Sequence, residues 1–115
     1  MITKVTLSNG TVAHLEGFGG FVFYSVYVGD ERKYFVMFSD TYGRVEVYRL
    51  KKDGNFSKKK PSKRDALYYG KIMRNLIEVN YDFSISDNWL YYWKPRAGNL
   101  LPFLLFLKFC GRDKN

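Results

Sequence analysis

The first 55 residues alternate between short β-prone segments and turn-forming residues, and this alternation limits the fold more than any other feature of the chain. Asn9-Gly10 stands between the first two segments, and Asn-Gly between β-prone runs is the strongest short hairpin signal. Short strands that are joined by short turns normally pair with their neighbours in the chain. The sequence therefore predicts an antiparallel meander of about five strands, over residues 2–7, 11–15, 21–28, 33–39 and 44–50.

The hydrophobic period changes from that of a strand to that of a helix at Ser62. Ser62 is a suitable N-cap, and the charge of Asp65 complements the helix dipole in the first turn. One helical face is apolar and predicts an amphipathic helix over residues 63–79; it holds Ala66, Tyr69, Met73, Leu76 and Ile77. The opposite face holds Arg64, Tyr68, Lys71, Asn75 and Glu78. A meander followed by a helix places the chain in the α+β class, as a single domain over residues 1–115.

The part of the chain after the helix predicts further apolar elements. Residues 81–85 alternate like a strand, and residues 89–93 form a dense aromatic run that is also typical of a strand. Residues 100–109 are apolar on every side, so periodicity does not separate helix from strand there. The leucine content and Pro102 favour a short buried helix, whereas the phenylalanine content permits a strand. This segment is expected to be the central buried element or part of a self-association surface that gives a homodimer.

The positive charge of the chain is concentrated in one fifth of its length. The net charge is +8, and residues 51–74 carry nine Lys or Arg against two Asp, a net charge of +7. Such a concentration creates a local potential that attracts anions. Three interpretations remain open: a solvated loop that aids solubility, a surface that contacts phosphates, and a surface that captures an acidic protein.

The phosphate interpretation assigns roles to particular side chains. Lysines neutralise phosphates and release counterions without precise geometry, and exposed aromatic rings hold the bases of single strands by stacking. Tyr42 and Tyr48 are expected to be exposed, since Tyr48 shares a strand face with Arg44 and Glu46. The candidate phosphate contacts are Lys51, Lys52, Lys58, Lys59, Lys60, Lys63, Arg64 and Lys71.

These residues favour a non-enzymatic nucleic-acid-binding protein, with single-stranded DNA or RNA preferred over a duplex. The alternative is a small inhibitor or adaptor that captures an acidic partner surface. A metal-dependent nuclease is a third hypothesis, with Glu31 and Lys33 as its candidates and Glu16 as the further acidic residue. No catalytic residue, metal site or cofactor is expected, because the chain has one histidine and one cysteine and so lacks a usual zinc ligand set.

The expected location is intracellular and cytoplasmic. Cys110 is the only cysteine, which excludes an internal disulfide and suits a reducing compartment. The N-terminus lacks the apolar stretch of a signal peptide. The longest apolar run is far shorter than the roughly 20 residues that cross a bilayer, so no membrane partner is expected.

Overall fold

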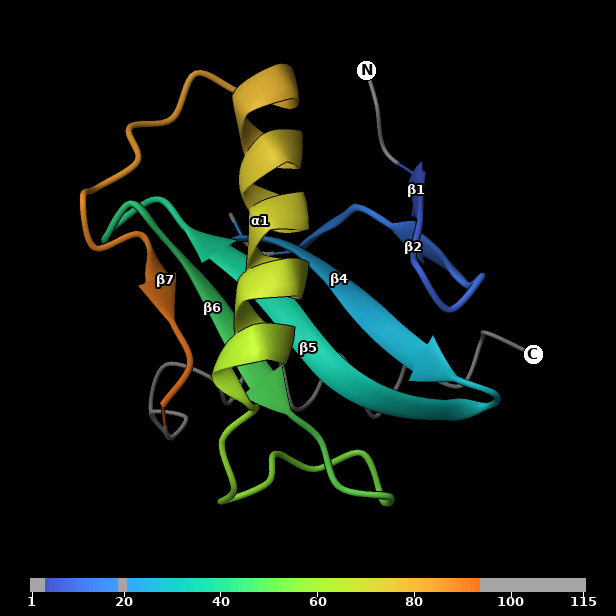
Figure 1. Cartoon of the computed structure of the whole chain (residues 1–115). Helices are drawn as coiled ribbons and strands as arrows, with labels where there is room; N and C mark the ends of the chain where they lie inside the picture. Colours follow the sequence, from blue (N-terminus) through green and yellow to red (C-terminus); the bar gives the residue numbers. More distant parts are fainter. Residues whose placement is uncertain (1–3, 19–20, 94–115) are drawn as a thin grey trace.

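The computed structural model describes residues 4–18 and 21–93, and it has the predicted α+β architecture. A five-stranded sheet has the order β3 (Glu16–Phe18), β4 (Phe21–Val28), β5 (Glu31–Ser39), β6 (Arg44–Arg49) and β7 (Leu90–Tyr91). The helix α1 (Lys63–Asn80) crosses one face of this sheet (Figure 1). Strands β1 (Lys4–Thr6) and β2 (Val12–His14) form the hairpin expected at Asn9-Gly10, as a separate two-stranded sheet.

Strands β3 to β6 form an antiparallel meander, and β7 is added to it in parallel. The prediction placed residues 2–7 and 11–15 in the same meander, but β1 and β2 form a sheet of their own, and β3 was not predicted. Val45 of β6 lies opposite Leu90, and Glu46 lies opposite Tyr91. A parallel neighbour requires a crossover connection of a dozen or more residues, and α1 together with the segment after it supplies this connection (Figure 1). Strand β7 therefore brings the chain back to the edge of β6, beside the loop that precedes the helix.

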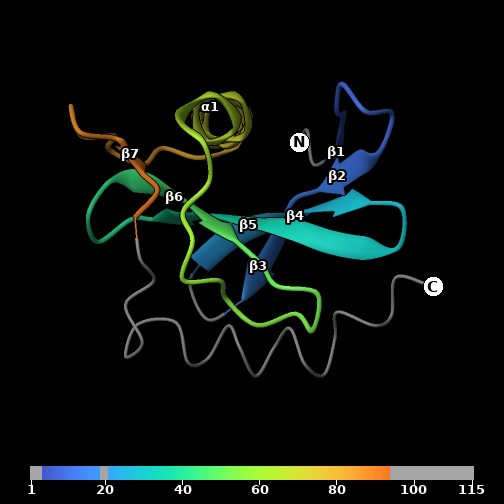
Figure 2. The ribbon, with the colours of Figure 1, turned by 60° about the horizontal axis from the view of Figure 1, so that its bottom comes forward.

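Both faces of the sheet are buried, which follows from the apolar residues at successive positions of β4 and β5. On the helix side, Val36, Val47 and Phe38 pack with Met73 and Ile77 of α1. On the opposite side, a second cluster contains Phe23, Phe35, Met37, Tyr48 and Leu50, with Phe56 packed against it. Figure 2 shows the helix on one side of the sheet.

The helix begins and ends where its sequence signals lie. The Ser62 hydroxyl accepts a hydrogen bond from the Asp65 backbone N–H at 3.1 Å, which is the expected N-cap. Tyr81 ends the helix by donating its backbone N–H to the Ile77 carbonyl. Close packing explains the glycine at position 70, because a Cβ built on it would lie only 2.6 Å from Leu90 Cδ1. A glycine at this position lets the helix approach β7 closely.

The prediction of a strand over residues 81–85 is wrong. Tyr81, Phe83 and Ile85 are half-buried and alternate with exposed residues, so the pattern is real, but residues 81–86 are irregular and belong to no strand. Instead the Phe83 ring stacks between those of Tyr81 and Phe38, at centroid distances of 5.0 and 5.5 Å. Alternation here reflects packing against the end of the core. Residues 100–109, and the homodimer predicted from them, lie outside the described residues.

Candidate nucleic-acid interface

The segment between β6 and α1 lies at one end of the sheet, next to the start of the helix (Figure 1). Across residues 4–18 and 21–93 the ion pairs are Arg44–Glu46 and Arg74–Glu78, so none of the predicted phosphate contacts is neutralised by a carboxylate there. The segment thus presents its charge to solvent. All eight predicted cations are exposed: Lys51, Lys52, Lys58, Lys59, Lys60, Lys63, Arg64 and Lys71.

The lysine-rich segment is attached to the sheet by backbone and aromatic contacts. The Ser57 N–H donates to the Arg49 carbonyl at 2.8 Å, and Leu50 and Phe56 form a β-bridge. The Phe56 ring makes edge-to-face contacts with Phe35 at 5.9 Å and with Tyr48 at 5.6 Å. Because Phe56 is anchored in the second core cluster, it fixes where Lys58, Lys59 and Lys60 leave the sheet.

Lys60 meets the aromatic residues at the end of β7. Its Nζ lies 3.9 Å from the centroid of the Trp93 ring and 5.8 Å from that of Tyr92. The Tyr92 and Trp93 rings are near-parallel, with centroids 5.0 Å apart and an interplanar angle of 18°. Trp93 is 49% exposed. A large aromatic surface is therefore adjacent to the lysine-rich segment.

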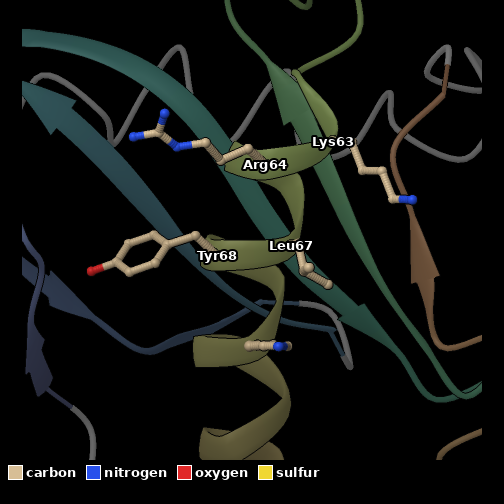
Figure 3. A pocket seen from close by; sticks show the side chains of 5 residues that line it. Lys63, Arg64, Leu67 and Tyr68 are labelled. Atoms are coloured by element: carbon tan, nitrogen blue, oxygen red, sulfur yellow. The ribbon is translucent and has the colours of Figure 1, made fainter.

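The first half of α1 forms a shallow basic hollow on the outer side of the helix (Figure 3). Arg64 and Tyr68 point to one side of the helix, Tyr68 toward the N-terminal hairpin, whereas Lys63 points to the opposite side, toward β7 (Figure 3). The Tyr68 hydroxyl accepts a hydrogen bond from the Ser8 N–H at 2.9 Å. The hollow is lined by Lys63, Arg64, Leu67, Tyr68 and Lys71. The helix start thus carries cations on both of its flanks.

The expectation that Tyr48 is exposed is wrong. It is 2% exposed, and burial together with the charge of Glu46 raises the pKa of its hydroxyl far above the usual range. Its hydroxyl donates to Glu46, and Arg44 Nε donates to Glu46 Oε2 at 2.9 Å. The polar residues beside Tyr48 indicated a solvent face, but they neutralise one another on the second buried face of the sheet. Tyr48 cannot stack on a base.

Tyr42 is 47% exposed, as expected, but it lies away from the lysines. It belongs to the turn that precedes β6, whereas Lys51 and Lys52 follow the other end of this strand (Figure 1). The Arg44 guanidinium carbon lies 4.7 Å from the centroid of its ring. The structure therefore separates Tyr42 from the basic surface that the sequence assigned to it.

The exposed aromatic residues next to the predicted cations are Tyr68 and Trp93, and not Tyr42 and Tyr48. Tyr68 could have been found, since it lies four residues after Arg64 on the polar face of the predicted helix, where an aromatic residue is unusual. Trp93 belongs to an aromatic run that stands beside Lys94 and Arg96 in the sequence, a pattern that allowed either an extension of the basic surface or core. Its contact with Lys60 joins residues that are separated by the whole helix, and it depends on the parallel pairing of β7.

The nuclease hypothesis finds no geometric support. Glu16 lies opposite Phe23 in the sheet and Glu31 lies opposite Val28, five residues farther along β4. At about 3.3 Å per residue, the backbone positions of the two glutamates are about 16 Å apart along the strand direction, and β4 lies between them, which is too far for both to ligate one metal ion. Within residues 4–18 and 21–93, no three His, Cys, Asp or Glu side chains are grouped closely enough to hold one.

No protein family, curated protein or solved structure matches the chain. In the part of the chain that the structure describes, no helix has both the length and the apolar character needed to span a membrane.

Proposed function

We propose that the protein binds nucleic acid without catalysing a reaction, and that it prefers single-stranded DNA or RNA. The observation that carries this proposal is the group of eight exposed cations around the helix start, none of which forms an ion pair within the described residues. Phosphates that replace the counterions of these side chains release ions to solvent, which drives binding. Exposed aromatic rings next to the cations support the preference for single strands.

The position of Lys63 and Arg64 supports an anionic partner. Both lie in the first turn of α1, where the helix dipole disfavours a cation by about 0.3–1 kcal/mol at an exposed site. Asp65 offsets part of this cost, but its Oδ2 also accepts a hydrogen bond from the Tyr34 hydroxyl at 2.8 Å. A phosphate near the helix start would interact favourably with both side chains and with the positive end of the helix dipole.

Capture of an acidic protein surface is the second candidate function, and one observation favours it. Leu67 and the ring of Tyr68 give the hollow on α1 an apolar floor between its cations. An apolar centre with a charged rim is typical of protein–protein interfaces. Leu67→Ala should leave nucleic-acid affinity unchanged, since a phosphate makes no use of this side chain. A large loss of oligonucleotide binding in this variant would count against the phosphate role of the hollow.

The proposed function is tested by the salt dependence of binding to a labelled oligothymidylate, measured by fluorescence anisotropy. Replacing Lys58 and Lys59 with alanine should reduce the slope of log K against log salt by about 1.4 units, at about 0.7 per phosphate contact for a single strand. Stability should change little, because both side chains are exposed and form no ion pair within residues 4–18 and 21–93.

The matched control lowers the net charge by the same two units at the opposite end of the sheet. Thr41 is in the turn that precedes β6 and Ser84 lies beside this turn, and both are exposed, so the control is Thr41→Glu with Ser84→Glu. The control should keep the slope of the unmodified protein. Equal losses in both double variants would show that only total charge matters, and no binding at low salt would refute the proposed function.

A further inference from the structure

We propose that Trp93 is a stacking site for one unpaired base, and that the Lys60 ammonium covers its ring until the base arrives. This inference rests on the proposed function and deepens it, because it names the part of the nucleic acid that the site recognises. It joins two segments that are far apart in the chain: the lysine-rich segment before α1 and the residues that follow β7.

The Trp93 ring has the exposure and the surroundings of a base-stacking residue. It is 49% exposed, and the near-parallel ring of Tyr92 stacks on it at a centroid distance of 5.0 Å, which helps to hold the Trp93 ring in place. The Lys60 ammonium lies over the ring, its sequence neighbours Lys58 and Lys59 are exposed, and Lys63 points toward β7 (Figure 3). A flat ring beside a lysine-rich segment complements a nucleotide, in which a flat base is joined to an anionic phosphate.

An unpaired base fits this site better than a base pair. In a duplex the faces of each base are covered by its neighbours in the stack, so a protein ring meets a base face only where the strand is single. Aromatic stacking is also tolerant of base identity, because every base has a π face. The site is therefore expected to accept single strands of many sequences.

Lys60 links the two parts of the site. Its ammonium lies 3.9 Å from the centroid of the Trp93 ring, a cation–π contact that shields the ring in the free protein. A base that stacks on the ring displaces this ammonium, and the flexible lysine stem allows it to move to the phosphate of the same nucleotide. Stacking and phosphate contact then occur together.

Tyr68 is the weaker candidate for the same role. It is 38% exposed, and its hydroxyl is bound by the Ser8 N–H while its ring makes an edge-to-face contact with Tyr69 at a centroid distance of 4.9 Å. These contacts make Tyr68 part of the wall between the helix and the N-terminal hairpin.

The experiment compares oligothymidylate with an abasic oligonucleotide of equal length, which has the same phosphates but no bases. The protein should bind oligothymidylate at least about five-fold more tightly, the lower end expected for one stacked base. In a Trp89→Phe variant Trp93 is the only tryptophan, and its fluorescence should be quenched by oligothymidylate but not by the abasic strand. If Trp89→Phe does not fold, the difference between the unmodified protein and Trp93→Leu gives the same signal.

Two substitutions of Trp93 separate stacking from packing. Trp93→Leu should remove the preference for oligothymidylate and leave abasic affinity unchanged, while Trp93→Phe should retain part of it. Equal binding of both strands with unchanged fluorescence would overturn this inference and leave the proposed function in place. Failure to bind either strand at low salt would overturn both.

Discussion

The residue that best shows how the sheet is held together is Glu46, which is charged and only 6% exposed. It accepts hydrogen bonds from Arg44 Nε and from the Tyr48 hydroxyl, two residues away on either side along β6. The Arg44 guanidinium carbon in turn lies 4.7 Å from the Tyr42 centroid and 4.2 Å from that of Tyr91 in β7. A buried carboxylate is tolerated only when such partners compensate its charge.

Removing one partner of the Arg44–Glu46 pair should destabilise the folded protein more than removing both. Arg44→Met leaves the Glu46 carboxylate buried without its cation and should lower the free energy of unfolding by about 3–5 kcal/mol. The double variant Arg44→Met with Glu46→Leu removes both charges and should be clearly more stable than Arg44→Met alone. Urea denaturation of the single and double variants measures the coupling. Additive losses would contradict a compensated buried pair.

At the scale of elements, the helix and the long strands could be predicted because their signals are local. The cap at Ser62 and the apolar period gave the helix to within one residue, and the turns gave the β4–β6 meander. The pairing of β7 could not be predicted, because it depends on the path of the chain after the helix. The contact between Trp93 and Lys60 could not be predicted for the same reason. Tyr48 was misjudged because polar neighbours on one strand face do not reveal whether they pair with each other or with water.

The start of α1 offers a prediction in which stability and binding change independently. Ser62→Ala removes the hydrogen bond to the Asp65 N–H and should lower stability by about 1 kcal/mol. Because it changes no charge, oligonucleotide affinity should stay the same. Ser62→Asp keeps the cap and places a carboxylate beside the first turn, so stability should hold or rise while affinity falls. Thermal denaturation and anisotropy measure the two quantities, and parallel changes in both variants would contradict the proposed position of the phosphates.

At the scale of the whole molecule, tyrosine is the residue type that couples the core to pH. The chain has 10 tyrosines, and several extend from the core with their hydroxyls engaged. Burial raises the pKa of Tyr24 well above its usual value, and the charge of Tyr69 adds to this. Burial also raises the pKa of Tyr34 to about 12, with a further contribution from its hydrogen bond to Asp65. The pKa values of Tyr48 and Tyr69 are raised as well, mainly by burial.

The folded protein should therefore lose stability in alkali. A raised pKa means that the folded state keeps a proton that the unfolded chain releases, so stability is fully present below the ordinary tyrosine pKa of 10.0 and falls as the pH rises above it. For Tyr34 the loss extends to about pH 12. Urea midpoints measured across this range should decrease steadily.

Lysines also lose their charge at alkaline pH, and Tyr34→Phe controls for this because it alters none of them. It should lower stability at neutral pH by removing the hydrogen bond to Asp65. Above pH 10 it should also reduce the slope of the unfolding free energy against pH, by at most the contribution of one titrating proton. An equally steep decrease in Tyr34→Phe would show that this hydroxyl does not titrate with unfolding.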